Sequence, residues 1–228
     1  MIHLGLPIED CLDQLKQCLS ERNEVVLEAP PGAGKTTLVP LALLDEAWLS
    51  GKKILMLEPR RIATKSAAHR MASLINESPG QTVGYRMRLD TKVSKQTRIE
   101  VMTEGILTRM LQKDPSLEEV GLVIFDEFHE RNLDSDLALS LCLKGRTLFR
   151  DDQAPLKILI MSATLDSQAI AQLLDNAPIV SSEGKSYPVD INYGRASQPK
   201  ERIVDRMVTT IKQALMDNPQ SSLLSFLP

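Results

Sequence analysis

The sequence has 228 residues, of which 27 are basic and 30 are acidic, so the net charge is −3 when the histidines are neutral. Hydrophobic residues make up 43% and charged residues 25%, which is typical of a soluble globular protein and excludes a disordered chain, a collagen and a coiled coil. The near-neutral charge gives no bulk reason to expect a nucleic-acid partner.

Targeting signals are missing from the sequence. No apolar run approaches the roughly 20 residues that cross a membrane, and Glu9 and Asp10 stand where a signal peptide would be apolar. The three cysteines, Cys11, Cys18 and Cys142, form no C-x-x-C pair. We therefore expect a cytoplasmic protein with buried thiols and no membrane partner.

Short β-rich apolar runs alternate with helical patterns along most of the chain. Strands are expected at 25–27, 54–57, 99–102, 122–125 and 158–161. Helices are expected at about 8–20, 36–46, 63–75, 105–112, 134–148 and 167–173. This alternation predicts βαβ units, and continuously apolar strands predict burial on both faces. The expected fold is α/β, with a mainly parallel sheet and helices on both faces.

The pattern changes after residue 174, where prolines and glycines punctuate short extended pieces up to residue 200. This indicates the end of one domain and a linker. An amphipathic helix is expected over 203–216, and an apolar run at 223–227 predicts a strand. A helix and one strand cannot bury themselves alone, so either they pack on the first domain or they open a second one.

The strongest motif is a glycine-rich loop between a strand and a helix, Ala29-Pro30-Pro31-Gly32-Ala33-Gly34-Lys35-Thr36. Gly32 and Gly34 let the backbone turn its N–H groups toward one anion, and the helix N-terminus adds positive charge. Lys35 is placed to reach the β- and γ-phosphates, and the Thr36 hydroxyl to bind Mg²⁺. The strict phosphate-loop pattern has glycine where Ala29 stands, so the alternative is a glycine-rich turn before an ordinary helix.

A second motif, Asp126-Glu127-Phe128-His129, ends the buried strand at 122–125. Because the carboxyl end of a parallel strand faces the ligand crevice, Asp126 is placed to hold Mg²⁺ and Glu127 to act as general base on the attacking water. The alternative is an acidic helix start, which does not explain why the pair follows a phosphate loop about 90 residues upstream.

Three other predicted strands are followed by short polar segments, which are Glu58-Pro59-Arg60-Arg61, Thr103-Glu104-Gly105 and Ser162-Ala163-Thr164. The cations of the first segment and the hydroxyl and backbone N–H groups of the second suit phosphate oxygens, although each is equally explained as a solvated turn with a cap. Taken alone, Ser162-Ala163-Thr164 is best explained as a helix N-cap. His129 does not lie in an H-E-x-x-H pattern, and the scattered histidines and cysteines form no metal-ligand cluster.

In this order the motifs resemble those of the superfamily 2 helicases, specifically the DEAH-box branch. Motif I resembles Gly32–Thr37, motif Ia Pro59–Arg61, motif Ib Thr103–Gly105, motif II Asp126–His129 and motif III Ser162–Thr164. Phe128, the Glu130-Arg131 that follows motif II, and the glycine-rich loop look most like the HrpB group of bacterial helicases.

The resemblance implies a RecA-like P-loop NTPase domain that uses ATP and Mg²⁺ as cofactors and RNA, through its phosphate backbone, as partner. It implies that residues 1–195 are the first RecA-like, ATP-binding domain, and that residues 196–228 are a linker and the first helix and strand of a truncated second RecA-like domain.

Residue roles follow from the same resemblance. ATP is bound by Gly32, Ala33, Gly34, Lys35, Thr36 and Thr37, with Arg70 stacking on the base and Thr36 and Asp126 holding Mg²⁺. The catalytic set is Lys35, Asp126, Glu127 and His129. His129, Ser162 and Thr164 couple the nucleotide state to domain movement. The RNA track is formed by Arg60, Arg61, Thr103 and Glu104.

The function expected from the resemblance is the ATP-binding domain of an ATP-dependent RNA helicase. The second domain of these helicases supplies arginine fingers, and such a finger contributes about 10³–10⁵ in rate in comparable NTPases. The chain alone is therefore expected to bind nucleotide but to hydrolyse it slowly and not to unwind. Two rival functions are another P-loop phosphotransferase and a nucleotide-dependent interaction module without RNA contacts.

The net charge conceals an asymmetry. Residues 52–113 hold 13 basic and 5 acidic side chains, a net charge of +8, whereas the remainder holds 14 and 25, a net charge of −11. The basic part carries the expected RNA-facing segments and the acidic part carries the expected Mg²⁺ carboxylates, so the total charge is a poor guide to partners.

Overall fold

A computed structural model describes residues 3–151, 155–163, 167–184, 189–194, 196 and 202–226. The chain divides into two compact units, residues 1–186 and 187–228. The first unit contains the sheet and the helices that cover it, and the second contains α7 (Ile203–Asp217).

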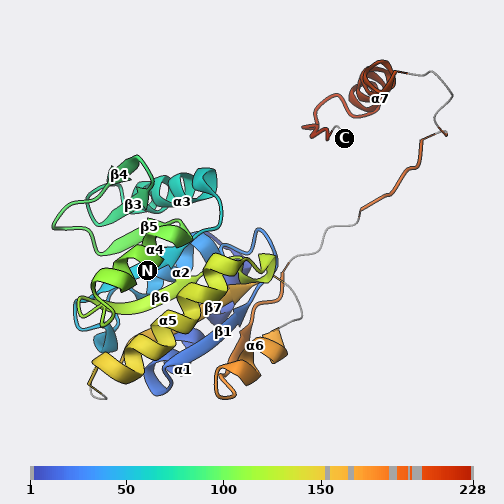
Figure 1. The fold of residues 1–228 in the computed structure, drawn as a ribbon. Coiled ribbons are helices and arrows are strands. Elements are labelled where there is room, and N and C mark those ends of the chain that lie inside the picture. The colour runs from blue at the N-terminus through green and yellow to red at the C-terminus, as the bar shows by residue number, and fades with distance from the viewer. Residues whose placement is uncertain are drawn as a thin grey trace. The chain divides into compact units, whose positions relative to one another are not determined.

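An eight-stranded sheet runs through the first unit in the order β4-β3-β5-β2-β6-β7-β1-β8 (Figure 1). Neighbouring strands are parallel, except that β3 and β4 are antiparallel. The strands are β1 (Glu24–Glu28), β2 (Lys53–Leu57), β3 (Val83–Met87), β4 (Asp90–Lys92), β5 (Ile99–Met102), β6 (Val120–Phe125), β7 (Lys157–Ser162) and β8 (Ile179–Ser181). The prediction of a mainly parallel α/β fold is confirmed.

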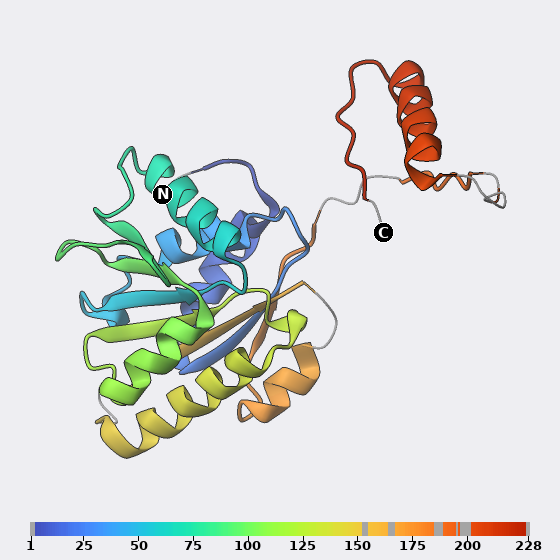
Figure 2. The ribbon, with the colours of Figure 1, turned by 45° about the horizontal axis from the view of Figure 1, so that its top comes forward.

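Helices cover both faces of the sheet (Figure 2). One face packs against α1 (Leu12–Glu21), α2 (Lys35–Leu43) and α3 (Arg61–Leu74), and the other against α4 (Glu104–Lys113), α5 (Leu133–Phe149) and α6 (Ser167–Leu173). Single 3₁₀ turns lie at Pro7–Cys11, Ala47–Leu49 and Phe128–Glu130.

Strand β6 shows why the central strands are continuously apolar. Leu122 and Ile124 enter the core under α1–α3, whereas Val123 and Phe125 enter the core under α4–α6. Every residue of β6 is buried, and each large apolar side chain buried in this way stabilises the fold by about 1.5–3 kcal/mol. Two helical layers therefore demand a strand without polar alternation.

Three strands, β3, β4 and β8, escape the sequence prediction because they are short or carry polar residues and glycine. Gly84 lies in the middle of β3, where a Cβ atom would stand 2.4 Å from the Lys92 carbonyl oxygen. Such a close backbone approach excludes a side chain, so the residue that makes the β3–β4 hairpin possible also weakens its strand signal.

The second unit departs from the prediction in its last residues. Helix α7 forms where a helix is predicted, and none of its side chains is buried. The strand predicted at 223–227 is wrong for its described part, because Leu223–Phe226 has no strand assignment. A strand needs a hydrogen-bonded neighbour, and no partner strand adjoins these described residues. Within the described residues no helix is long and apolar enough to cross a membrane.

Candidate nucleotide-binding site

The glycine-rich loop joins the end of β1 to the start of α2. Gly32 and Gly34 have φ angles of +80° and +96°, a region that only glycine adopts without strain. The Ala33 N–H donates to the Pro30 carbonyl oxygen at 3.2 Å, which closes the turn. Because the first N–H groups of a helix have no intrahelical acceptor, the loop and the start of α2 together form a cradle for an anion.

Two side chains that follow this loop contact the acidic motif at the end of β6. The Lys35 Nζ lies 2.8 Å from the Glu127 Oε1, and the Thr36 hydroxyl donates to the Asp126 Oδ2 at 2.5 Å. Lys35 and Asp126 are both buried, with 3% and 4% of their surfaces exposed. The structure thus brings the two strongest sequence motifs together at the carboxyl edge of the sheet.

His129 connects the acidic motif to the end of β7. The Ala163 N–H donates to the His129 Nδ1 at 3.4 Å, and the His129 Nε2 lies 3.4 Å from the Glu127 Oε2. These contacts assign the proton to Nε2, since Nδ1 accepts. Ser162, at the end of β7, is buried, and its carbonyl oxygen accepts the Ala29 N–H at 3.0 Å. Thr164 lies outside the described residues.

The backbone around the acidic motif is strained. Glu127 and Arg131 have φ angles of +50° and +43°, values that cost side-chain-bearing residues about 1–3 kcal/mol each and that cluster at functional sites. Phe128 anchors the turn between them, because its buried ring packs edge-on against Phe125 with 6.0 Å between centroids. The packing of Phe128 therefore holds the strained backbone in place.

Glu58 is a site residue that the sequence reasoning missed. It follows β2, and because Leu57 and Phe125 are paired in register, Glu58 lies beside Asp126. Burial, followed by the charges of Asp126 and Glu127, raises the pKa of Glu58 to about 9. Glu58 therefore holds its proton at neutral pH beside Asp126, whose own pKa is raised chiefly by burial.

The protonation of Glu58 predicts a pH dependence of stability. Between the ordinary pKa of 4.5 and the folded value of about 9, the folded chain holds a proton that the unfolded chain has released. The free energy of unfolding should therefore fall as the pH rises, by up to about 1.4 kcal/mol per pH unit. Urea unfolding of the nucleotide-free chain in EDTA at about pH 6, 7 and 8 measures this slope. Glu58→Gln should flatten it, and equal slopes for both chains would contradict the assignment.

A pocket of about 430 Å³ opens beside the phosphate loop. Its lining joins residues of the loop, of β2 and α3, and of the acidic motif, namely Thr36, Thr37, Glu58, Pro59, Arg60, Ala63, Ser66, Ala67, Arg70, Glu127 and Glu130. Arg70 is exposed on α3 at this pocket, so the residue expected to stack on the base shares one cavity with the residues expected to bind the phosphates.

The four residues expected along the RNA track differ in how exposed their side chains are. The exposed Arg60 pairs with Glu130, with 2.6 Å between Nη2 and Oε1, and Arg61 donates to the Arg88 carbonyl oxygen at 3.1 Å. Thr103 is half-buried at the start of α4. Glu104 is 8% exposed and accepts hydrogen bonds from Asn132 and Ser135, so its carboxylate holds α4 to the start of α5 rather than facing solvent.

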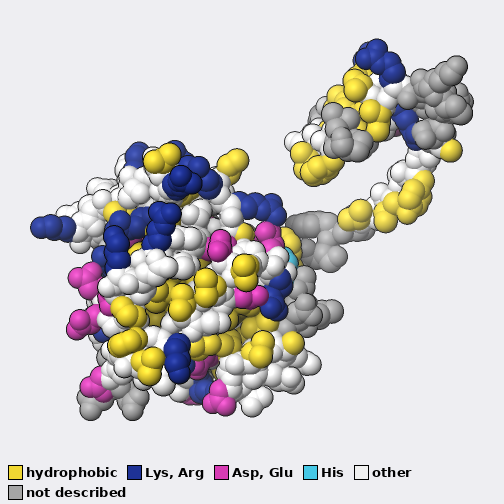
Figure 3. All heavy atoms as spheres, viewed as in Figure 1, with side chains coloured by type: hydrophobic (Ala, Val, Ile, Leu, Met, Phe, Trp, Pro, Cys, Tyr) yellow, Lys and Arg dark blue, Asp and Glu magenta, His cyan; other side chains and the backbone are white. Residues whose placement is uncertain are grey.

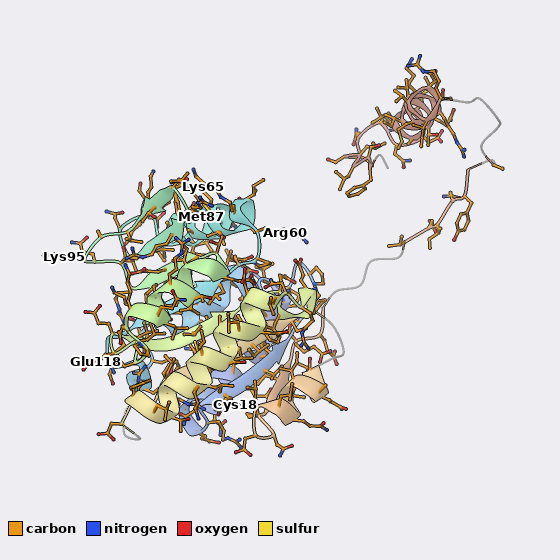
Figure 4. The ribbon with its side chains drawn as sticks, in the orientation of Figure 1. Cys18, Arg60, Lys65, Met87, Lys95 and Glu118 are labelled. Atoms are coloured by element: carbon orange, nitrogen blue, oxygen red, sulfur yellow. The ribbon has the colours of Figure 1, made fainter. Side chains whose placement is uncertain are left out.

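Basic side chains gather over α3 and the β3–β4 hairpin (Figure 3). Arg60 and Lys65, labelled in Figure 4, extend from the start and the first half of α3. The exposed cations of α3 and the adjoining hairpin are Arg61, Lys65, Arg70, Arg88, Lys92 and Lys95. The positive segment noted in the sequence is therefore a positive surface next to the pocket.

The parallel sheet, the glycine-rich loop between β1 and α2 and the acidic pair at the end of β6 define a RecA-like domain of the P-loop class. Residues 12–173 match the family described as DEAD/DEAH box helicase. The match covers most of the chain, and the chain belongs to this family. Membership of the family implies ATP binding.

Individual relatives agree with this assignment. The chain is 49% identical over 224 residues to the ATP-dependent RNA helicase HrpB of Escherichia coli, covering 98% of this chain and 27% of that protein. It is 37% identical to the ATP-dependent RNA helicase HrpA of Borreliella burgdorferi, covering 93% and 25%. A crystal structure of the Escherichia coli DEAH/RHA helicase HrpB superposes with a TM-score of 0.85 at 48% identity, covering 94% and 27%. The chain thus spans about a quarter of the length of these relatives.

Proposed function

We propose that residues 1–195 are the first RecA-like, ATP-binding domain of an ATP-dependent RNA helicase, and that residues 196–228 are a linker and the beginning of the second RecA-like domain. The observation that carries the proposal is the pairing of Lys35 with Glu127 and of Thr36 with Asp126 at 2.8 and 2.5 Å. A cytoplasmic place of action is part of the proposal.

Lys35 and Glu127 each take a new partner when nucleotide binds. Lys35 leaves Glu127 for the β- and γ-phosphates, which carry more charge than one carboxylate. Glu127 is then free to orient the attacking water and accept its proton. Its backbone is already fixed by the turn at Phe128, so the carboxylate needs only a change of rotamer. Hydrolysis therefore follows from positioning and electrostatics rather than from a covalent intermediate.

The donor set at this site fits magnesium. Thr36 and Asp126 offer a hydroxyl and a carboxylate oxygen, and Mg²⁺ prefers one or two such protein oxygens together with substrate phosphates. Among the described residues no group of three or more His, Cys, Asp or Glu side chains could hold a metal ion. Bound there, Mg²⁺ would neutralise developing charge on the phosphate oxygens.

We assign the coupling role to His129, Ser162 and Thr164. The contacts of His129 with Glu127 and with the Ala163 N–H support this role, because a shift of the Glu127 carboxylate toward water changes a contact that reaches the end of β7. Chains of hydrogen bonds and packed side chains of this kind can carry energetic coupling between two sites.

RNA is the proposed partner of the basic surface, and Arg60 and Arg61 are its proposed backbone contacts. The double change Arg60→Ala and Arg61→Ala should weaken binding of a single-stranded RNA about tenfold and reduce the slope of log affinity against log salt by about one to two. Fluorescence anisotropy at several salt concentrations measures both quantities on the longer protein that contains this domain.

A matched control removes two exposed cations away from α3, Lys113 and Lys144. This variant has the same net charge but should keep the wild-type salt slope. An equal loss of RNA affinity in both double variants would mean that only overall charge matters. If the Arg60 and Arg61 substitutions leave the RNA affinity unchanged, these residues do not contact the RNA backbone.

A further inference from the structure

The segment that precedes α1 packs on the outer side of the phosphate loop. A Cβ atom on Gly34 would stand 2.8 Å from the Leu6 Cδ1 and 3.3 Å from the Ile8 Cγ2. Leu6 and Ile8 therefore rest directly on the Gly34 backbone. The Ile8 side chain is fully buried, so this contact belongs to the core and is not an incidental surface touch.

A hydrogen bond fixes the peptide that joins Ala33 to Gly34. The Ile8 N–H donates to the Ala33 carbonyl oxygen at 3.1 Å. In a trans peptide the carbonyl oxygen and the following N–H point in opposite directions. Holding the Ala33 carbonyl against Ile8 therefore directs the Gly34 N–H away from Ile8, to the side of the loop on which a phosphate would be bound.

Glu9 holds this segment in shape. Its Oε1 accepts hydrogen bonds from the backbone N–H groups of Leu4 at 2.8 Å and Leu6 at 2.9 Å. Its Oε2 lies 3.2 Å from the His3 Nδ1. Pro7, between Leu6 and Ile8, restricts φ and so reduces the freedom of the turn. One carboxylate thus sets the position of the Leu6 backbone and, with it, of the side chain that lies on Gly34.

We propose that the segment His3–Cys11 holds the loop Pro30–Gly34 in its phosphate-binding conformation before nucleotide arrives, with Leu6, Ile8 and Glu9 as positioning residues. The inference rests on the proposed function, because it concerns how the same loop binds a nucleoside di- or triphosphate. Gly34 cannot make this contact through a side chain of its own, so the loop obtains its rigidity from a segment outside the motif.

The expected size of the effect follows from the population of the competent loop. Apparent affinity falls by the fraction of molecules whose loop is correctly shaped, so a loop that is competent only one-tenth to one-fifth of the time binds about five- to tenfold more weakly. Leu6→Ala and Glu9→Ala should each weaken binding of Mg·ADP by about this factor. Calorimetric titration of the chain with Mg·ADP measures it.

Two variants separate positioning from a general loss of structure. Glu9→Gln retains an Oε1 acceptor for both backbone N–H groups and should keep the wild-type affinity, whereas Leu4→Ala alters a partly exposed side chain of the same segment and should leave affinity unchanged. Hydrogen exchange at the Gly32–Thr36 amides should be faster in Glu9→Ala than in wild type and return to the wild-type rate in Glu9→Gln.

The outcomes are distinct. Wild-type chain that does not bind Mg·ADP would overturn the proposed function. Wild-type chain that binds, together with Leu6→Ala and Glu9→Ala variants that bind equally well, would overturn the positioning role alone. If Leu6→Ala melts at a much lower temperature than wild type, the two Glu9 variants decide the question. Weaker Mg·ADP binding by Glu9→Ala and wild-type binding by Glu9→Gln would support the inference. Equally weak binding by both Glu9 variants would contradict it.

Discussion

Lys35→Ala is expected to lower the affinity of the chain for ADP and ATP by about 10²–10³, because it removes the cation that would pair with the phosphates. Truncating one partner of a buried charge pair between protein and ligand costs about 2–5 kcal/mol, and each 1.4 kcal/mol is a factor of ten. The Lys35 side chain is 4% exposed and its ammonium lies 2.8 Å from Glu127. Without it, the phosphates would enter a site that holds the Glu127 carboxylate and no nearby compensating cation. Calorimetric titration of the chain with Mg·ADP measures the loss.

The control for this prediction breaks a different lysine ion pair. Lys16→Ala removes a contact of 3.0 Å with Glu46 at a part-buried position away from the phosphate loop, and nucleotide affinity should not change. The double variant Lys35→Ala and Glu127→Gln relieves the unpaired carboxylate and should recover stability without recovering affinity. If Lys35→Ala binds nucleotide as tightly as wild type, the glycine-rich loop is not the nucleotide-binding site.

Turnover of ATP by the 228-residue chain alone should be about 10³–10⁵ slower than turnover by the longer protein of which it is the proposed first domain, because an arginine finger contributes about that factor in comparable NTPases. The helicase family is expected to supply this finger from its second RecA-like domain. The chain carries Lys35, Asp126 and Glu127, so binding should be retained while hydrolysis is slow. Steady-state release of phosphate, with and without RNA, measures the difference.

Glu127→Gln in the longer protein tests whether both proteins use the same site. The amide cannot accept the proton of the attacking water, so turnover should fall toward the rate of the isolated chain. Mg·ADP should still bind, at least as tightly as to wild type, because the Glu127 carboxylate no longer competes with the phosphates for Lys35. RNA-stimulated turnover by residues 1–228 at the rate of the longer protein would show that the chain needs no finger from elsewhere.

The sheet was predictable from sequence where burial is two-sided. Strands such as β6 can be recognised because every residue is apolar, and the helices between them can be recognised from the helical spacing of their apolar residues. Strands at or next to the edges of the sheet are harder to predict: the edge strand β8 has only three residues, Ile179–Ser181, and β3, next to the edge strand β4, contains Gly84. Their pairing depends on neighbours far away in sequence, which local pattern does not encode.

The candidate site shows the same division. Lys35, Thr36, Asp126 and Glu127 could be chosen from motifs at strand ends, and the structure brings them together in two contacts, Lys35 with Glu127 and Thr36 with Asp126. Glu58 could not be chosen in this way, since its proximity to Asp126 depends on β2 lying beside β6 in the sheet. A single sequence gives no strand order, so a residue that matters only through its neighbour in an adjacent strand stays hidden.

Glu104 shows a different difficulty: a residue that follows a strand is expected to face solvent and a ligand, although position in the sequence does not determine exposure. Its place after β5 suited a contact with nucleic acid, yet the carboxylate turns inward to Asn132 and Ser135. Helix α5 supplies those partners, and their approach depends on how α4 and α5 pack. Orientation of a side chain at the first turn of a helix is therefore a tertiary property.

The contact between Lys35 and Glu127 places a carboxylate of the chain in competition with the phosphates of a nucleotide for the same ammonium. The carboxylate is tethered beside the ammonium, so it competes with any incoming or departing phosphate at a high local concentration. Entry of ATP has to displace it, and departure of phosphate is assisted by its return. On the proposed function, Glu127 would thus both orient the attacking water and speed release of the products, which would link the end of one catalytic cycle to the start of the next.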